Sequence, residues 1–338
     1  MTKKEFINEL ESKMKKAGKQ NDFLRVSEYF IEMIDDMIEN GVSEEGAVGN
    51  LGDIDEIIRE YSGDESIPPE PNEGIVKSTF PESEIRKLTI SDFNNSFEII
   101  PTSGDKFEVT SFETEEKGYE IKEVGDELRI IAFRKETGIR KWFHFDVRSK
   151  TLVVKVPKNF RGDIDASTTN GSARVERLAC GDVVIKTRNG ALHLDTIAAN
   201  TINASSTNGA IRSATVKAKS ITLGTSNGSV YLDSVATENL KASSSNGPFH
   251  VSTVAAETID LHTSNGSMSV NKVAAERSIS MTSSNGSITG VIGGKMSDYA
   301  ITSSTSNAKN NLPNGTSGPK KLHVSTSNAR INIDFCEK

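Results

Sequence analysis

Side chains that could bind a ligand or move a proton recur at a fixed spacing in the second half of the chain. One set is cationic or aromatic and repeats at a constant step: Arg174, His193, Arg212, Tyr231 and His250. A second set follows shortly after the first in the same repeats and contains Glu176, Asp195 and Asp233. If these residues stack on one outer face, they form a mixed strip of donors and acceptors that could hold a glycan or a peptide. A solvated outer face is the simpler interpretation, and a ligand strip is the alternative.

Catalytic chemistry is not favoured by these residues. Polysaccharide cleavage needs two closely placed carboxyl groups, but the acidic set is interrupted by Ala214. No phosphate-binding loop, nucleophile motif or calcium-binding glycine-rich run is present. Cys180 and Cys336 fit neither a metal-ligand nor a redox spacing. We therefore predict a non-enzymatic protein with no catalytic residue, metal or cofactor; a carbohydrate-active β-helix enzyme is the second alternative.

The dipeptide Asn-Gly marks the repeat that would position these side chains. Its asparagines follow one another at steps of 19, 19, 19, 19, 19 and 20; they are Asn170, Asn189, Asn208, Asn227, Asn246, Asn265 and Asn285. Asn307-Ala308 and Asn328-Ala329 continue the series at steps of 22 and 21. A unit this short cannot bury a face by itself, so it gains stability by stacking on its copies.

Apolar and polar residues alternate within each repeat. Counted from the asparagine, position −6 is always Ile, Val or Leu, position −2 is always Ser or Thr, and positions +3 and +5 are mostly apolar. Alternate residues of a strand point to one face, so the Ser/Thr should turn inward, and the asparagine shares their parity. In a parallel stack, identical side chains about 4.8 Å apart can form hydrogen-bonded ladders. The glycine is expected to allow a left-handed backbone.

These patterns predict a mainly β fold class: a parallel β-solenoid of 19-residue coils, preceded by a small all-α domain of four short helices. Right-handed winding is assumed from the general preference of parallel crossovers. Asn-Gly between alternating strands is also the strongest hairpin signal, but propeller blades repeat at about 40 residues. Apolar pairs between residues 85 and 154 follow a similar rhythm, so the solenoid is expected to start near residue 85. Large aromatic residues there should close its open end: Phe97, Phe107, Trp142 and Phe143.

The body resembles the bacterial putative-adhesin β-strand-repeat family of unknown function. The resemblance rests on the reiterated Ser/Thr-x-Asn-Gly-x-φ-x-φ, in which φ is apolar, and on Val156-Pro157 ahead of the first repeat; it covers residues 75–335. It implies a repetitive β body and indicates little about mechanism.

The spacing of apolar residues predicts an acidic helical domain over residues 1–61. Apolar residues fall at helical spacing in two stripes, which are Phe6, Ile7, Leu10, Met14 and then Val26, Phe30, Met33, Ile34, Met37, Ile38. We interpret both stripes as the core of this domain. Ser43 should cap a third helix and Asp53 a fourth, whose apolar face shows Ile54, Ile57, Ile58 and Tyr61.

This segment resembles the HAAS-type helical domain. The carrying features are a Tyr-led helix from Tyr29, then Gly-Val-Ser-Glu-Glu-Gly-Ala, then Leu-Gly-Asp-Ile-Asp-Glu-Ile. Ile54 stands near where the family usually has proline. The resemblance implies a signalling or protein-interaction module, often found beside PadR-type transcription regulators. It therefore suggests that residues 1–61 bind another protein, with a PadR-type regulator as the candidate.

Charge and composition divide the chain further. Residues 1–73 carry a net charge of −11 and residues 74–338 a net charge of +4, with no basic stripe that would favour direct nucleic-acid binding. Residues 62–73 contain three prolines and four acids, which is typical of an extended linker. The predicted domains are thus the helical domain 1–61, the linker 62–73, irregular first coils 74–160 and the regular solenoid 161–338.

No apolar signal or membrane-spanning stretch is evident in the sequence, so we expect a cytoplasmic protein without membrane insertion; peripheral association with the envelope is the alternative. The predicted function is a non-catalytic interaction or signalling scaffold, in which the helical head docks a partner and the solenoid acts as a sensor or assembly arm. The alternative is an adhesin-like envelope protein that binds protein or glycan, although no sequence feature specifically supports a glycan.

Overall fold

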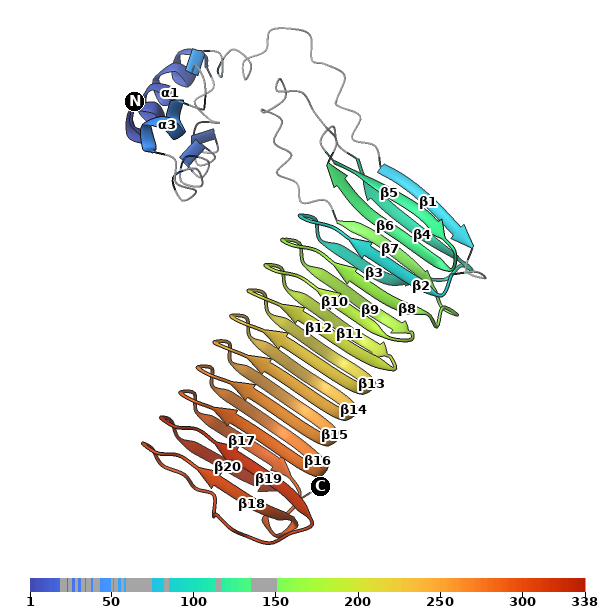
Figure 1. The fold of residues 1–338 in the computed structure, drawn as a ribbon, viewed down its shortest axis with the longest axis vertical. Coiled ribbons are helices and arrows are strands. Elements are labelled where there is room, and N and C mark those ends of the chain that lie inside the picture. The colour runs from blue at the N-terminus through green and yellow to red at the C-terminus, as the bar shows by residue number, and fades with distance from the viewer. Residues whose placement is uncertain are drawn as a thin grey trace. The chain divides into compact units, whose positions relative to one another are not determined.

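The computed structural model describes residues 1–18, 43–49, 75–81, 85–113, 117–134 and 151–337, together with isolated residues and pairs between 23 and 58. It divides into two compact units. One consists of Met1–Asn72 with Thr137–Asp146 and the other of Glu73–Glu136 with Val147–Lys338. Each unit is described by itself below (Figure 1).

The first unit contains α1 (Lys3–Lys16) and α3 (Glu44–Gly49). Thr2 caps α1 by accepting a hydrogen bond from the Glu5 amide, and the Glu5 carboxylate accepts one from the Thr2 amide. Ser43 accepts from the Gly46 amide at 3.2 Å, as expected for the cap of α3.

Residues from both predicted apolar stripes are buried together in this unit: Phe6, Leu10, Met14, Phe30, Ile34, Ala47, Val48, Leu51 and Ile54. Ile7 and Val26 are partly buried against this core. Ile38, which was also expected in the core, is exposed, so the interpretation of the stripes as core holds for their other described members. Met33, Met37, Ile57, Tyr61 and the predicted linker lie outside the described residues.

The second unit is a parallel β-solenoid. Its regular part contains β8 (Asp163–Ser167), β9 (Ala173–Ala179), β10 (Val183–Lys186), β11 (Leu192–Ala198), β12 (Thr201–Ser206), β13 (Ile211–Thr225), β14 (Val230–Ser244), β15 (Phe249–Thr263) and β16 (Met268–Ser283). Each coil pairs with the next in the register that the Asn-Gly spacing predicts, as in Ile202 opposite Ile221 and Ile211 opposite Val230. The parallel stack and its period confirm the predicted fold class.

Each coil has three sides, because the inward–outward alternation breaks at two corners after the Asn-Gly turn. In β13, Ala214 and Thr215 both point outward, and so do Lys219 and Ser220. The first break coincides with a column of non-glycine residues in the left-handed region, with φ between 52° and 55°: Arg177, Thr196, Thr215, Ser234, Thr253 and Lys272. Such residues are uncommon outside glycine, and here they turn the chain onto the third side.

The glycine of Asn-Gly has a different role from the expected one. None of the repeat glycines from Gly171 to Gly286 has a positive φ, so the prediction of a left-handed glycine is wrong. They are required because the coils approach closely at this turn. A Cβ added to Gly209 would lie 1.7 Å from the carbonyl oxygen of Gly190, and the same conflict recurs at the other repeat glycines.

The Ser/Thr at position −2 points inward as predicted. Thr225 is buried, donates a hydrogen bond to the Gly209 carbonyl at 3.1 Å and accepts one from the Gly228 amide at 3.1 Å. The asparagines form the expected ladder, with the Asn227 Nδ2 donating to the Asn208 Oδ1 at 2.7 Å. They lie on the exposed corner, however, and do not share the inward direction of the Ser/Thr.

The N-terminal end of the stack departs from sequence order (Figure 1). The strands β2 (Lys87–Ser91) and β3 (Phe97–Thr102) form a coil between β8/β9 on one side and β6 (Glu127–Arg134) and β7 (Leu152–Pro157) on the other. Antiparallel strands β1 (Ile75–Pro81), β4 (Lys106–Phe112) and β5 (Lys117–Val124) complete this end. A coil near residue 85 is thus present, but the apolar pairs of β4 and β5 belong to antiparallel strands and not to coils.

Two of the aromatic residues expected to close this end are buried there. Phe97 and Phe107 are fully buried, and Phe107 packs edge-on against Phe160 with ring centroids 5.2 Å apart. Trp142 and Phe143 lie outside the described residues.

The C-terminal end also departs from sequence order. It contains β17 (Ile288–Gly293), the short helix η3 (Met296–Asp298), β18 (Tyr299–Ser304), β19 (Lys320–Ser325) and β20 (Ile331–Cys336). β19 lies between β16 and β18, so the asparagine ladder runs from Asn285 to Asn328 and only then to Asn307. The loop after Asn310 covers the free edge of β18, since the Gly315 amide donates to the Ile301 carbonyl and the Thr316 hydroxyl donates to the Tyr299 carbonyl, both at 2.9 Å.

Candidate functional site

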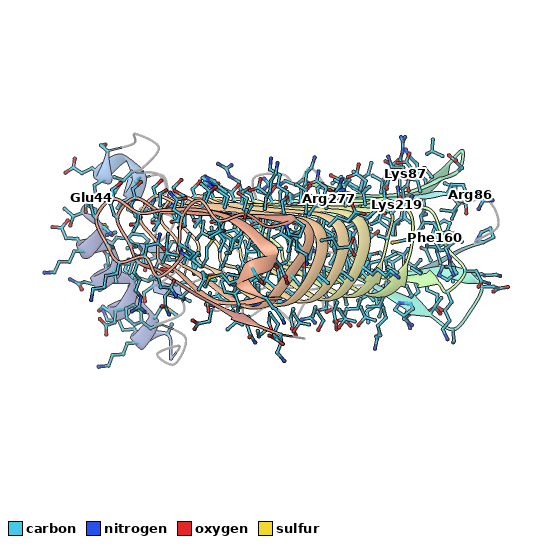
Figure 2. The ribbon with its side chains drawn as sticks, turned by 90° about the horizontal axis from the view of Figure 1, so that it is seen from below. Glu44, Arg86, Lys87, Phe160, Lys219 and Arg277 are labelled. Atoms are coloured by element: carbon cyan, nitrogen blue, oxygen red, sulfur yellow. The ribbon has the colours of Figure 1, made fainter. Side chains whose placement is uncertain are left out.

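The stack brings the predicted strip together on one outer side. His193 is opposite both Arg174 and Arg212, and Tyr231 lies between Arg212 and His250. These residues project from β9, β11, β13, β14 and β15 at position +4. In a view turned by 90°, the coils lie one behind another with side chains projecting around them (Figure 2). Glu98 of β3 is opposite Arg174 and extends the column; the sequence analysis missed it because its coil lacks the Asn-Gly motif.

Three members of the strip form a continuous stack. The Arg212 guanidinium carbon lies 4.0 Å from the centroid of the Tyr231 ring. The Tyr231 and His250 rings are stacked on the other side, with centroids 4.8 Å apart and planes at 13°. Since both faces of the Tyr231 ring are covered, a ligand can reach this ring only through its edge and its hydroxyl.

The acidic residues at position +6 make ion pairs and hydrogen bonds near the β9 end of the strip. The Arg174 Nη1 is 2.8 Å from the Glu176 Oε1, and Arg177 reaches the other Glu176 oxygen at 3.8 Å. Asp195 accepts a hydrogen bond from the Thr196 hydroxyl at 3.0 Å. Asp233, which follows Tyr231 on the same strand, is exposed. The strip therefore has an ion-paired half near β9 and an aromatic, less paired half near β14.

The protonation of His193 follows from its position in the column. Burial lowers its pKa, and the positive charges of Arg174 and Arg212 lower it further, against a smaller opposite effect of Glu176. The imidazole is therefore neutral at neutral pH and able to donate and accept one hydrogen bond each. With these groups the strip can bind a ligand by hydrogen bonds and charge.

The described part of the chain contains no site for metal or thiol chemistry. No group of three or more His, Cys, Asp or Glu residues that could hold a metal ion occurs there. Burial raises the pKa of the Cys180 thiol to about 12, with a smaller contribution from Asp163, so this thiol is protonated at neutral pH and unreactive. Cys180 and Cys336 are both free.

Among the described helices, none has the length and apolar character needed to span a membrane. A comparison with curated proteins found no match.

Several solved structures resemble the chain at low identity. A putative adhesin from Bacteroides fragilis NCTC 9343 is 11% identical with a TM-score of 0.42, covering 78% of this chain and 99% of its own. A putative adhesin from Parabacteroides merdae ATCC 43184 is 14% identical with a TM-score of 0.40, covering 78% and 98%. A putative lipid binding protein from Parabacteroides distasonis ATCC 8503 is 13% identical with a TM-score of 0.41, covering 78% and 98%. At these values none of them supplies a function for this chain.

A protein-family model also matches most of the chain. Residues 85–334 match the family described as Toastrack DUF4097. This range begins just before β2 and ends within β20, so it includes all the regular coils and the rearranged ends of the stack except β1. The chain belongs to the Toastrack DUF4097 family.

Proposed function

We propose that the chain is a non-catalytic binding scaffold, in which the solenoid presents the strip from Glu98 to His250 to a ligand and the helical head docks another protein. The observation that carries this proposal is the stack of Arg212, Tyr231 and His250, which places cationic and aromatic groups on one fixed line of the rod.

The rigidity of the coils supports a binding role for this strip. Each turn is held to the next by an asparagine hydrogen bond at the outer corner and by a Ser/Thr hydrogen bond inside, as at Asn246 to Asn227 and Ser244 to Gly228. Backbone positions on such elements keep their spacing, so binding requires no ordering of the main chain. A ligand that spans several coils would meet a preformed row of groups about 4.8 Å apart.

The head supports the docking part of the proposal through its resemblance to HAAS-type domains. Its described core is small, and the segment is strongly acidic with a net charge of −11 over residues 1–73. An acidic module selects partners with a basic surface. We propose a transcription regulator of the PadR type as the partner, in accordance with that resemblance.

An affinity capture from lysate of the native host tests the scaffold proposal. Full-length protein would be compared with a chain lacking residues 1–73 and with the full-length variant Arg212→Ala/Tyr231→Ala. Loss of one protein partner only on removal of residues 1–73 would support docking by the head. Capture of envelope proteins or glycans by all forms except the strip variant would favour the adhesin-like function instead. Equal capture by all three forms would contradict both assignments.

A further inference from the structure

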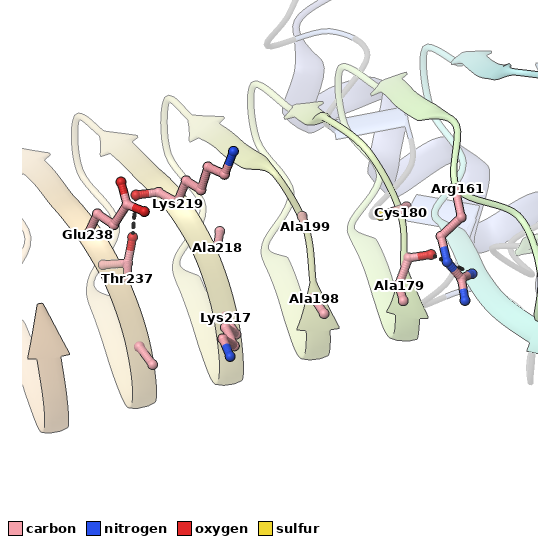
Figure 3. Close-up of a pocket in the computed structure, with 11 residues that line it drawn as sticks. Arg161, Ala179, Cys180, Ala198, Ala199, Lys217, Ala218, Lys219, Thr237 and Glu238 are labelled. Carbon is pink, nitrogen blue, oxygen red and sulfur yellow. Dashed lines mark hydrogen bonds between the residues drawn. The ribbon is translucent and has the colours of Figure 1, made fainter.

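The third side of the coils carries a shallow groove that the sequence analysis did not identify (Figure 3). Two adjoining hollows, which share Ala236, Thr237 and Glu238, extend it from Arg161 near the first regular coil to Lys295 near the last. The floor consists of small residues at positions +9 and +10, such as Ala198, Ala199, Ala255 and Ala256.

This side differs in character from the strip. The outward residues at position +4 are arginine, histidine and tyrosine, whereas the outward column at +9 is mostly alanine and is exposed at Ala179, Ala198, Ala236 and Ala255. Aligned small apolar residues leave a smooth surface that a second flat surface could approach closely. Lys217 is the one charged residue of this column between Ala179 and Ala274.

Charges along the groove are separated by sign. Lys217 and Lys219 lie in one coil, and the following three coils carry an acid at position +11: Glu238, Glu257 and Glu276. The Glu257 carboxylate forms an ion pair with Arg277, whose Nη2 lies 2.6 Å from the Glu257 Oε2. Lys217, Lys219 and Glu238 have no ion-pair partner within 4.0 Å among the described residues, so the centre of the groove holds opposite charges that are available to another molecule.

We propose that this groove is a docking surface for a second copy of the chain in antiparallel orientation. A two-fold axis that crosses the groove between the coil of Lys219 and the coil of Glu238 places each lysine against the partner's Glu238, twice in the dimer. The same axis places Ala198 against the partner's Ala255 and Ala179 against the partner's Ala274, so alanine columns meet. In a parallel pair with the two-fold axis along the alanine column, Lys217 would face the partner's Lys217, and like charges in contact oppose association.

The size of the groove sets the expected strength of the dimer. Six coils at about 4.8 Å each give a contact about 29 Å long and one sheet side wide, which is at the small end of specific interfaces. We therefore expect a dimer that dissociates on dilution. This inference is independent of the ligand strip, which lies on a different side of the coil.

Sedimentation equilibrium of the full-length protein over a concentration series tests the charge pairing. Lys219→Glu or Glu238→Lys alone should weaken dimerisation by about tenfold or more, and the double variant should restore the wild-type dissociation constant. Lys241→Glu, a charge reversal on another side of a coil, is the matched control and should leave it unchanged. A wild-type protein that stays monomeric at every concentration would overturn the proposal, and so would a double variant as weak as the single ones.

Disulfide trapping tests the antiparallel register. In a full-length Cys180→Ser/Cys336→Ser background, the pair Ala198→Cys/Ala255→Cys should give a covalent dimer on oxidation, while either cysteine alone should not. Dimers formed by the single variants would indicate the parallel arrangement and overturn the assignment. Circular dichroism of each variant shows whether it is folded before either result is interpreted.

Discussion

The regular coils and the N-terminal end of the solenoid make the hydrogen bonds of their turns with different residues at equivalent positions. At position −2 the regular coils have a buried Ser or Thr, which accepts from the glycine amide of its own turn and donates to the carbonyl of the turn before it. In the coil of β2 and β3 the corresponding residue is Asp92. Its carboxylate accepts from the amides of Phe93, Asn94 and Asn95 at 2.6, 3.0 and 3.1 Å.

The partners behind Asp92 explain the exchange. No Asn-Gly turn stacks against its far side in the described structure, and Lys117 and Tyr119 of β5 occupy that place. The Lys117 Nζ lies 2.7 Å from the Asp92 Oδ1, and the Tyr119 hydroxyl donates to the Asp92 Oδ2 at 2.5 Å. Inside the stack, position −2 needs a side chain that can donate a hydrogen bond to the carbonyl of the preceding turn. At the N-terminal end the neighbouring side chains are donors, so a side chain that only accepts hydrogen bonds is needed there.

The same comparison holds at position +1. In the regular coils a glycine is required there because the preceding turn is too close for a Cβ. In the coil of β2 and β3 the residue is Asn95, whose side-chain amide donates to the Tyr119 hydroxyl at 3.1 Å. The residue type at a repeat position is therefore decided by what is stacked behind it as much as by the strand in which it lies.

The largest predicted effect is at Asp92. Asp92→Asn removes one partner of a buried ion pair and leaves the Lys117 charge poorly compensated, which should lower the free energy of unfolding by about 3–5 kcal/mol. Urea denaturation followed by circular dichroism measures it. Asp165→Asn, at an exposed carboxylate of β8, should change stability by less than about 0.5 kcal/mol; an equal loss in both variants would contradict the role given to Asp92.

The contribution of Asp92 should also depend on pH. Burial alone would raise its pKa, but hydrogen bonds from Lys117 and Tyr119 and the Lys117 charge outweigh burial, so its pKa is lowered in the folded protein. Its stabilisation is then fully present above the ordinary carboxyl pKa of about 3.9 and is lost as pH falls through the lower folded-state value. The difference in melting temperature between the wild type and Asp92→Asn should shrink in that acidic range and stay constant from neutral pH down to about pH 5.

The close approach of regular turns gives the next largest effect. Gly228→Ala would place a Cβ 2.0 Å from the Gly209 carbonyl oxygen, and separating the coils should cost about 3 kcal/mol. Gly224→Ala is the matched control, because its Cβ would meet only the Ser243 hydroxyl at 3.8 Å. Similar denaturation midpoints for the two variants would show that the stack yields easily at its turns.

Substitutions in the asparagine ladder should change stability more in its interior than at its end. Asn227 donates to Asn208 and accepts from Asn246, so Asn227→Asp loses a donor and should cost about 1 kcal/mol. Within the described part of the chain, the Asn94 side chain only accepts, from the Asn170 amide at 2.7 Å, so Asn94→Asp should be close to neutral. Thermal denaturation of the two variants at neutral pH measures the difference; an equal cost at both positions would contradict the donor argument.

The smallest predicted effect is a gain in stability at a local exception. Ser213 is buried at position +5, between the positions of Leu194 and Leu232 in neighbouring coils, and its hydroxyl has no hydrogen-bond partner among the described residues. Ser213→Val should raise the free energy of unfolding by about 1 kcal/mol. Ser244→Val removes a hydroxyl that is fully bonded in its turn and should lower stability, so opposite shifts in the denaturation midpoint are expected.

Much of the regular body could be predicted because its information is local and repeated. The constant step, the inward Ser/Thr, the asparagine ladder and the alignment of Arg174 to His250 all follow from counting positions between Asn-Gly turns. Glu98 escaped because its coil has Asn94-Asn95 at the turn. The groove was not predicted because alanine after position +8 indicates only a small side chain. The register of the strands was needed to show that successive coils present these alanines on the same surface.

The sequence by itself favoured a parallel stack of similar coils, since a unit of about 19 residues is too short to bury a face alone and is about half the period of a propeller blade. Only the tertiary structure decided the order of the end coils, with β2 and β3 inserted ahead of β8 and β9 and with β19 placed between β16 and β18. Alternation within a strand states which side chains face inward but not which strand lies beside it. At the ends, where the exact repeat is lost, pairing depends on which strand best covers an exposed edge, and that is a property of the assembled stack.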